Sequence, residues 1–242
     1  MHTIRIIGPG RAGRSLAVAL AARGWHVAGV LGRSDDVSGA ARGVDVLVIA
    51  TPDDVVADVA TAVVPVVGTT VVHLSGSLGL DALAPHPMRA GVHPLVPLPN
   101  PEVGAARLVS GVTFAVAGAP LGRTMVETLG GRIVEVADDD RAAYHAAACI
   151  AANHVVALLG QVERVAASVG LDLESFLPLT RAAVDDVAAL GPEAALTGPA
   201  RRGDWATLSR HLDALPEGER SGYQAGAALA TRLAEASVPA AV

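Results

Sequence analysis

Lysine is absent from this chain of 242 residues, in which all 18 basic residues are arginine. Without a lysine amine the protein cannot form a Schiff base with a carbonyl substrate, and it cannot use lysine as a general acid. Mechanisms that depend on either group are therefore excluded.

Cysteine and aromatic residues are also scarce. The single cysteine, Cys149, excludes an intramolecular disulfide and favours a cytoplasmic location. Nothing in the sequence around it indicates activation, so we expect it to be a packing residue. Aromatic residues make up only 2% of the chain, and the core must therefore consist mainly of alanine, valine and leucine.

The chain has no excess of positive charge and no evident targeting segment. Its net charge of −6 argues against nucleic-acid binding through a basic surface. The first predicted strand, residues 3–7, follows directly on the first residues without a basic and apolar leader, so we expect no signal peptide.

Two stretches, residues 59–80 and 142–162, lack charged side chains over roughly the length of a membrane span. The first contains Pro65 and Gly68 and is typical of loop and strand. The second contains several polar side chains, and we expect it to be the buried helix of a soluble protein. No association with a membrane is therefore predicted.

A glycine motif organises the N-terminal part of the chain. Gly8, Gly10 and Gly13 have the spacing G-x-G-x-x-G between a short apolar strand and a helix predicted at residues 11–23. In dinucleotide-binding folds the first glycine allows a sharp turn, the second admits the pyrophosphate, and the third allows close packing of helix on strand. The helix N-terminus then binds the phosphates. A glycine-rich turn without a ligand is the alternative.

The predicted cofactor contacts extend from this motif to the end of the second strand, residues 25–31. Arg33 and Ser34 follow that strand, and they suit the 2′-phosphate of NADP better than the ribose hydroxyl of NAD. Asp35 and Asp36 come later and are expected to cap a helical turn; Arg33 is alternatively a solvated loop charge. The contacts predicted in the glycine motif are Gly8, Pro9, Gly10, Arg11, Ala12 and Gly13.

Two further loops are predicted to lie against the cofactor, because they follow strands of a parallel sheet. Thr51 and Pro52 come after the third strand, and Ser75 and Ser77 after the fourth. Thr51 is also expected to cap a helix. Turn capping is the alternative role for the serines.

The pattern of elements predicts an α/β fold: a Rossmann-type, doubly wound, mostly parallel sheet followed by a small all-α domain. Pro94 begins a proline-rich run that is expected to form an ordered loop over the cleft. The expected strands are residues 3–7, 25–31, 44–50, 69–74, 90–92, 112–117 and 132–136. The expected later helices are residues 122–129, 141–169, 172–190, 193–196, 204–215 and 217–236, with a possible kink at Pro178.

The pattern changes near residue 137, which predicts two domains. Residues 1–137 form the dinucleotide-binding domain, and residues 138–242 form a helical domain for substrate binding and dimerisation. The long alanine-rich helix is too apolar to face solvent on all sides, so we expect a homodimer built on the helical domain.

Three polar residues are candidates for catalysis. His93 follows a strand end and is the first candidate for a proton donor; a loop histidine without a role is the alternative. His145, Cys149 and Asn153 share a face of the long helix because they are four residues apart. Asn153 would bond a substrate carbonyl or the nicotinamide amide, with His145 beside it. The alternative is a polar seam between helices.

Thr197 and Arg201 are candidates for substrate binding. The guanidinium of Arg201, or of Arg202, suits a substrate carboxylate. The alternative is a turn in which Asp204 caps the next helix. No metal site is expected, since no cysteine or glutamate lies at ligand spacing from the loop histidines.

Taken together, these motifs resemble the NADP-dependent reductases in which a Rossmann domain precedes a helical domain. Ketopantoate reductase, pyrroline-5-carboxylate reductase, prephenate dehydrogenase and 6-phosphogluconate dehydrogenase share that plan. The chain is most similar to an uncharacterised subfamily that pairs a Rossmann-like domain with a short helical domain of unknown function. The matching pieces are residues 8–13, 50–53, 73–77, 91–94, 144–145, 151–153, 196–199 and 202–204.

The resemblance implies a helical domain like the C-terminal domain of 6-phosphogluconate dehydrogenase and an NADP-dependent reaction. This chain lacks the catalytic lysine of ketopantoate reductase and 6-phosphogluconate dehydrogenase. His93 resembles the region of the catalytic histidine of prephenate dehydrogenase, although the match is partial.

The expected function is NADP(H)-dependent oxidoreduction of a small carbonyl, imine or 2-hydroxy acid by hydride transfer between the domains. One alternative is a non-catalytic NADP(H)-binding sensor or accessory protein, which the missing lysine favours. A deazaflavin-linked NADP reductase is a third possibility, since it shares the glycine turn and the residues after strand two. The substrate and the direction of reaction stay open.

Overall fold

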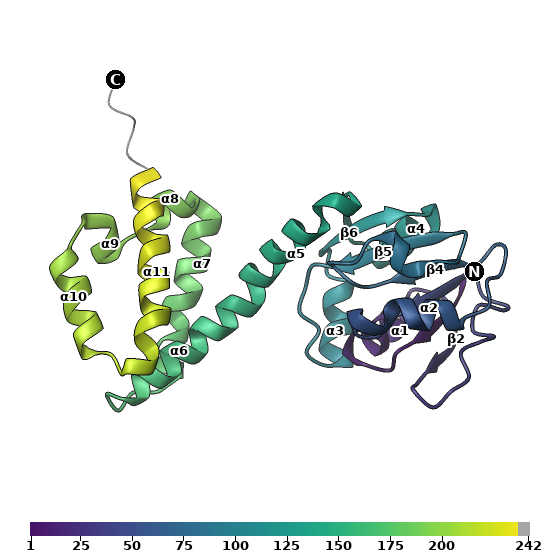
Figure 1. The fold of residues 1–242 in the computed structure, drawn as a ribbon, viewed down its shortest axis with the longest axis horizontal. Coiled ribbons are helices and arrows are strands. Elements are labelled where there is room, and N and C mark those ends of the chain that lie inside the picture. Colours follow the sequence, from purple (N-terminus) through teal and green to yellow (C-terminus); the bar gives the residue numbers. More distant parts are fainter. Residues whose placement is uncertain (237–242) are drawn as a thin grey trace, which may run out of the picture. The chain divides into compact units, whose positions relative to one another are not determined.

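The computed structural model describes residues 1–236 of the chain (Figure 1). By its internal contacts the chain divides into two compact units, Met1–Ile150 and Ala151–Val242. The first unit contains a sheet with helices, and the described part of the second unit contains helices and connecting turns.

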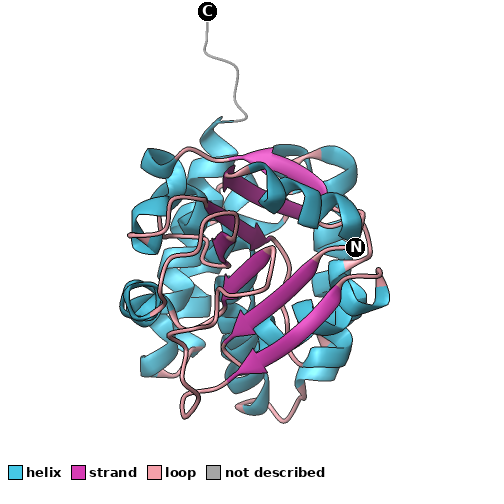
Figure 2. Cartoon of the chain, turned by 90° about the vertical axis from the view of Figure 1, so that its right-hand side faces the viewer, coloured by secondary structure: helices cyan, strands magenta, loops and turns pink. Residues whose placement is uncertain are grey.

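The sheet of the first unit has seven strands in the order β2-β1-β3-β4-β5-β6-β7. Figure 2 shows the strands of the sheet in magenta, with helices around them. Only β5 and β6 run antiparallel, and the other neighbouring pairs are parallel. The predicted Rossmann-type, mostly parallel sheet is therefore confirmed. The strands are β1 Thr3–Ile7, β2 His26–Leu31, β3 Val46–Ile49, β4 Thr70–His73, β5 Arg89–Pro94, β6 Thr113–Gly118 and β7 Arg132–Glu135.

Alternating side chains of the central strands enter two separate hydrophobic clusters. In β3, Val46 and Val48 pack into one cluster, and Leu47 and Ile49 pack into the other. Successive side chains of a strand point to opposite faces, so the sheet has a core on each side. This explains why β3 is apolar at every position.

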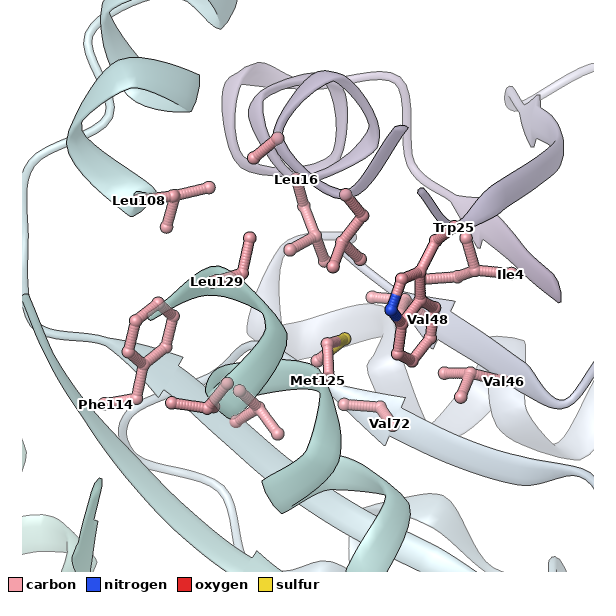
Figure 3. Close-up of a cluster of buried hydrophobic side chains, with 14 of the residues drawn as sticks. Ile4, Leu16, Trp25, Val46, Val48, Val72, Leu108, Phe114, Met125 and Leu129 are labelled. Atoms are coloured by element: carbon pink, nitrogen blue, oxygen red, sulfur yellow. The ribbon is translucent and has the colours of Figure 1, made fainter. Parts of the chain in front are cut away.

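The larger cluster lies under three helices of the first unit. Leu16 of α1 (Arg11–Ala22), Leu108 of α3 (Pro101–Leu108) and Met125 of α4 (Pro120–Leu129) belong to it together with Trp25 and Phe114 (Figure 3). The smaller cluster includes residues of α2 (Val56–Ala62).

Helix α3 was not predicted, although the sequence carries its start signals. The side chain of Asn100 accepts a hydrogen bond from the Val103 amide at 2.8 Å, and Pro101 occupies the first turn. Asparagine before proline is a typical helix start. A Cβ on Gly104 would lie 2.1 Å from the Ser15 hydroxyl oxygen, which shows how closely α3 packs on α1.

The helix after the sheet is nearly continuous. Helix α5 (Arg141–Cys149) passes into a π-helical turn, η4 (Ile150–His154), and then into α6 (Val155–Ala167). The boundary expected near residue 137 follows the last strand, whereas the contacts divide the chain at residue 150. The difference arises because α5 packs against the first unit, with its first residue, Arg141, fully buried there.

This helix is not buried as we expected from the sequence. Residues Asp138–Ala167 are long and apolar enough to cross a membrane by length and composition, and their apolar window is 0% buried. Val156 is 70% exposed and Leu158 is 52% exposed. The prediction is wrong because the other described helices of the chain leave more than half of each of these side chains in solvent.

After α6, the second unit continues with five further α-helices and one 3-10 turn among the described residues. Pro178 lies in the first turn of α7 (Leu177–Leu190), after the 3-10 turn η5 (Leu173–Ser175), so it starts a helix and does not kink one. The remaining helices are α8 Pro192–Ala195, α9 Gly198–Arg202, α10 Trp205–Ala214 and α11 Glu217–Ala236.

Candidate functional site

The turn between β1 and α1 requires glycine at its first position. Gly8 has φ +112°, and a Cβ there would lie 2.5 Å from the carbonyl oxygen of Ala50. Its amide donates to the carbonyl of Leu31 at 2.9 Å, which ties the turn to the end of β2. The sharp turn therefore depends on a residue without a side chain.

The other two glycines of the motif have opposite surroundings. A Cβ on Gly10 would meet no heavy atom within 4 Å, whereas a Cβ on Gly13 would lie 2.1 Å from the Gly8 carbonyl oxygen. Gly10 directly precedes α1, and Pro9 and Arg11 beside it are exposed. Open space before a helix N-terminus, above a tightly packed third glycine, fits the pyrophosphate of a dinucleotide.

A closed turn follows β2. Arg33 and Ser34 are exposed at its tip, and the Asp35 amide donates to the Gly32 carbonyl at 3.3 Å. In return the Gly32 amide donates to Oδ2 of Asp35 at 2.6 Å. The prediction that Asp35 and Asp36 cap a helical turn is wrong, because the chain forms turns here and both carboxylates bond to local amides.

The loops after β3 and β4 are joined through Asp53. Its Oδ2 atom accepts hydrogen bonds from the hydroxyls of Ser75, at 2.6 Å, and Ser77, at 2.8 Å. Ser75 Oγ also accepts from the amides of Ser77 and Leu78, both at 3.1 Å, so its hydroxyl is largely occupied within the turn. Thr51 does not cap a helix as expected; its hydroxyl is buried and has no partner among residues 1–236.

Two histidines and a tyrosine meet beside the loop after β4. His93, in β5, lies with Nδ1 2.7 Å from the hydroxyl of Tyr144, and its ring centroid is 5.9 Å from that of His145. A Cβ on Gly76 would come within 2.6 Å of the His145 ring and 3.0 Å of the His93 ring. Glycine at this position therefore allows both rings to approach the loop.

Cys149 is the next polar group along α5. Its Sγ atom lies 3.9 Å from Nε2 of His145, one helical turn earlier. The two predicted residues His93 and His145 are thus brought together, with Tyr144 as the partner that the sequence analysis did not select.

Arg141 and His73 form a buried group beside this cluster that sequence reasoning also missed. Arg141 is 0% exposed; its Nε donates to Asp138 at 3.1 Å and its Nη1 to the Ser75 carbonyl at 3.5 Å. A Cβ on Gly91 would lie 2.7 Å from Nη2 of Arg141 and 3.0 Å from Cε1 of His73. In the described chain, Nη2 and both His73 ring nitrogens lack hydrogen-bond partners.

Burial keeps His73 and His93 neutral at physiological pH, because it lowers the pKa of each ring. Burial, followed by the charges of His145 and Arg141, lowers the pKa of His93 to about 4, while Asp53 opposes them. Burial followed by the charge of Arg141 lowers the pKa of His73 to about 4. Burial also raises the pKa of Tyr144, so its phenol stays protonated.

The remaining predicted residues belong to the second unit. Asn153 is exposed in the π-helical turn, Thr197 precedes α9 without a capping hydrogen bond, and Arg201 is exposed near the end of α9. Thr197 borders a surface depression of about 290 Å³ that Gln161 and Tyr223 also line. The alternative considered for this segment was a turn in which Asp204 caps the next helix, and this cap is present.

Asp204 caps α10, as that alternative requires. Its Oδ1 accepts from the Thr207 amide at 3.1 Å, and hydrogen bonds from Thr207 lower the pKa of Asp204. No cluster of three or more histidine, cysteine, aspartate or glutamate side chains able to hold a metal occurs between residues 1 and 236.

Several solved structures share the fold of this chain. A candidate NADP oxidoreductase from Bacteroides fragilis is 19% identical with a TM-score of 0.80, and the alignment covers 96% of this chain and 98% of that one. A protein from Thermotoga maritima is 22% identical with a TM-score of 0.71 and the same coverage. Pyrroline carboxylate reductase from Plasmodium falciparum, solved with NADP bound, is 14% identical with a TM-score of 0.60, again over 96% and 98%.

These likenesses show a fold shared with NADP-dependent reductases. No curated protein matches the chain. Residues 109–230, half of the chain, match the family described as a domain of unknown function, DUF2520. The match begins before β6 and runs through the helices to α11. The chain therefore belongs to the DUF2520 family, and its N-terminal part has a Rossmann-type fold.

Proposed function

We propose that this protein is an NADP(H)-dependent oxidoreductase that transfers a hydride to or from a small carbonyl, imine or 2-hydroxy acid. The observation that carries the proposal is the glycine turn, in which Gly8, Gly10 and Gly13 each have the surroundings that a dinucleotide site requires. The turn follows β1, and His93 lies near the end of β5, a strand joined to β1 through parallel pairs. Both therefore lie at the edge of the sheet where open α/β folds bind ligands.

The residues that would hold the cofactor come from this edge. Gly8 to Gly13 and the N-terminus of α1 would bind the pyrophosphate, and Arg33 with Ser34 would bind the 2′-phosphate. The rest of the cofactor would be lined by Thr51, Pro52 and Ser75. When bound, the nicotinamide supplies or accepts the hydride.

The His93–Tyr144 pair would supply the polar group that the substrate needs. Both side chains are neutral at pH 7, and they share one hydrogen bond of 2.7 Å. If Tyr144 donates to Nδ1, the Nε2–H of His93 remains as a donor; if Nδ1 carries the proton, the tyrosine hydroxyl remains. In either tautomer one donor is left for a substrate oxygen or nitrogen.

The neutral form of His93 also permits the reverse direction. A neutral imidazole accepts a proton from a substrate hydroxyl, and His93 keeps this form down to about pH 4. The His93–Tyr144 pair would thereby replace the catalytic lysine that ketopantoate reductase and 6-phosphogluconate dehydrogenase use. His145, with its ring near that of His93, would assist it.

Residues of the second unit are proposed as substrate contacts on chemical grounds. The amide of Asn153 suits a carbonyl, the guanidinium of Arg201 suits a carboxylate, and the hydroxyl of Thr197 suits either. A small-molecule substrate with an acidic group is thereby proposed.

We also propose a cytoplasmic homodimer that forms through the second unit. The support is apolar exposure: Val156 is 70%, Leu179 is 69% and Leu229 is 60% exposed in the single chain. Faces of this kind on helices are typical of subunit interfaces.

The proposal is tested by binding and then by turnover. Thermal unfolding with NADPH, with NADH and without ligand measures binding, because a ligand specific for the folded state raises the midpoint. Oxidation of NADPH is then followed with 2-keto acids, cyclic imines and other small carbonyls. We expect H93Q and Y144F to retain cofactor binding and to lose turnover about 100-fold or more.

Three outcomes would contradict parts of the proposal. No midpoint shift with either cofactor would overturn the oxidoreductase assignment. Binding without turnover on any substrate would favour the sensor or accessory function. Full activity in H93Q and Y144F would show that the pair is not catalytic.

A further inference from the structure

Arg141, the first residue of α5, carries a positive charge into the interior of the first unit. Its side chain is 0% exposed, and arginine is rarely buried to this extent. It makes one ion pair, with Asp138, and a hydrogen bond of 3.5 Å to the Ser75 carbonyl, while Nη2 has no partner among the described residues. Because burying a charge in this way costs free energy, stability alone does not explain the residue.

The sheet leaves room for this guanidinium. His73 of β4 and Gly91 of β5 are register partners in neighbouring parallel strands, so the two positions face the same side of the sheet. A Cβ on Gly91 would lie 2.7 Å from Nη2 of Arg141 and 3.0 Å from Cε1 of His73. The missing side chain at Gly91 therefore lets the guanidinium lie against β5.

Helix α5 and strand β5 meet a second time at the proposed catalytic pair. Arg141 and Tyr144 share a helix face because they are three residues apart, and Gly91 and His93 share a strand face because they are two apart. The Tyr144 hydroxyl lies 2.7 Å from Nδ1 of His93. Arg141 thus lies against β5 at Gly91, and Tyr144 bonds to β5 at His93. Together the two contacts fix how α5 lies along the strand.

A third connection runs to the loop after β4. Nη1 of Arg141 donates to the carbonyl of Ser75, and a Cβ on the next residue, Gly76, would come within 3.0 Å of the His93 ring. The guanidinium is therefore linked both to the strand that carries His93 and to the loop that borders its ring.

We propose that Arg141 is a positioning residue whose guanidinium fixes α5 on β4 and β5 and so holds the Tyr144 hydroxyl at His93. The inference rests on the proposed function, in which the His93–Tyr144 pair serves the substrate. Arg141 acts through this pair and does not touch the substrate itself, because its side chain is fully buried. Loss of its contacts should misalign the pair, and a misplacement of about 1 Å can cost about 100-fold in rate.

Two variants disturb the guanidinium in different ways. R141M removes the charge and keeps a long side chain, whereas G91A keeps the charge and displaces the end of the Arg141 side chain. Both should fold. The Asp138 side chain is 44% exposed, so R141M leaves no buried charge unpaired, and in G91A the nearest atom belongs to a flexible side chain. G91A also crowds His73 and R141M does not, so a change common to both reports the guanidinium.

Arg123 provides the matched control. It is paired with Glu135 in the same unit, and its side chain is 44% exposed. R123M therefore makes the same substitution and removes the same charge at a pair that does not involve α5.

The first measurement is the nitrogen NMR signal of His93 Nδ1 at about pH 7, assigned by its absence in H93Q. It reports the bond to Tyr144 without any substrate, and Y144F gives its value when the bond is lost. We expect R141M and G91A to shift the signal towards that of Y144F, and R123M to keep the wild-type value.

The second measurement is NADPH oxidation with a 2-keto acid or cyclic imine that the wild-type protein reduces. We expect kcat to fall about 10–100-fold in R141M and G91A, since the pair is misaligned. The dissociation constant of NADPH should change by less than about twofold in both variants, because Arg141 is not among the residues proposed to bind the cofactor. R123M should match the wild type in both values.

The outcomes separate this inference from the function on which it rests. If the wild type is active and neither kcat nor the His93 signal changes in R141M and G91A, the inference is overturned and the function stands. A change in R141M alone would assign the effect to the charge and would also overturn the inference. If the wild type binds neither cofactor, the proposed function is overturned, and the His93 signal alone decides whether Arg141 positions Tyr144.

Discussion

The two units of the chain differ in how they bury apolar side chains. In the first unit, the core residues Ile4, Leu47 and Leu129 are 0% exposed. In the described part of the second unit, the buried hydrophobic residues are Ala166, Ala200, Leu208 and Ala234, which are 3–9% exposed. The first unit therefore has a complete core of its own, whereas the second has mainly small residues inside and large ones outside.

This difference indicates that the units are stabilised in different ways. Burial of apolar surface contributes about 25 cal/mol per Å², so a unit that leaves its large side chains in solvent lacks most of that contribution. The first unit should be stable as a single chain. The second should depend on association with another surface, and a second copy is the partner that we propose.

The largest change in the free energy of unfolding should come from adding one methyl group to a glycine of the first unit. In G13A the new Cβ would lie 2.1 Å from the Gly8 carbonyl oxygen, so backbone must move, and we expect a loss of more than about 3 kcal/mol. In G226A, within α11, nothing lies within 4 Å of the new Cβ. Alanine should therefore raise the free energy of unfolding by about 0.5–1 kcal/mol. Urea unfolding measures both; equal effects would contradict the comparison.

The next effect concerns association of the second unit. V156E and L179E place a charge on side chains that are 70% and 69% exposed in the single chain, so the isolated chain should tolerate them. If a second copy covers them, each should weaken the dimer about 100-fold or more, because a buried unpaired charge costs several kcal/mol. Light scattering over a concentration series measures the change.

The matched control for these variants lies in the first unit. Val67 is 95% exposed, and V67E should leave the mass and the melting temperature unchanged. A wild-type protein that stays monomeric at every concentration would contradict the proposed dimer.

A smaller effect should appear with pH, and it belongs to the first unit. His73 has its pKa lowered by burial from 6.5 to about 4, so the unfolded chain binds more protons than the folded chain between these values. Stability is therefore full above about pH 6.5 and falls as the pH drops towards 4, with His93 contributing in the same direction.

The variant H73L tests this pH dependence. Both ring nitrogens of His73 lack partners in the described chain, so leucine should cost little at neutral pH. The melting temperature of H73L should fall less between about pH 7 and about pH 5 than that of the wild type. An equal fall would show that His73 is not responsible.

The smallest effect on the melting temperature should come from removing surface ion pairs, and it should be similar in the two units. Arg164 and Glu219 join α6 to α11 at 2.5 Å, and Arg123 and Glu135 pair on the first unit. Water and salt screen both pairs, because Arg123, Glu135 and Arg164 are exposed over 44%, 77% and 60% of their side chains, although the Glu219 side chain is 14% exposed. E219Q and E135Q should each shift the melting temperature only slightly; a large shift in either would indicate that the pair is covered in solution.

Much of the fold could be predicted because its local signals agree with its global arrangement. The glycine spacing, the apolar strands and the loss of strands after residue 137 were all visible in the sequence. Helix α3 escaped because the prolines before it suggested a loop, although Asn100 and Pro101 mark a helix start. Burial of the helix at residues 142–162 was wrong since composition does not show which surface covers an apolar face.

The candidate site was only partly visible, because its contacts join distant residues. His93 and His145 could be proposed from their places after a strand and on a helix. The hydrogen bond between His93 and Tyr144 spans 51 positions, and the burial of Arg141 beside Gly91 depends on how α5 packs. The periodic pattern of apolar residues in a sequence does not indicate contacts between distant residues. Likewise Asp35 was expected to cap a helix, and only the folded turn reveals its bond to Gly32.

The order of strands in the sheet also bears on how the protein is made. After β1 and β2 pair, β3 adds to the free side of β1, and β4, β5, β6 and β7 each add beside the strand that preceded them. A sheet with this order can grow outward while the chain leaves the ribosome, since no later strand must insert between earlier ones. We therefore expect the first unit to fold during translation, before the second unit has been synthesised. The part of the protein for which we propose association with a second copy is then completed after the part that has its own core.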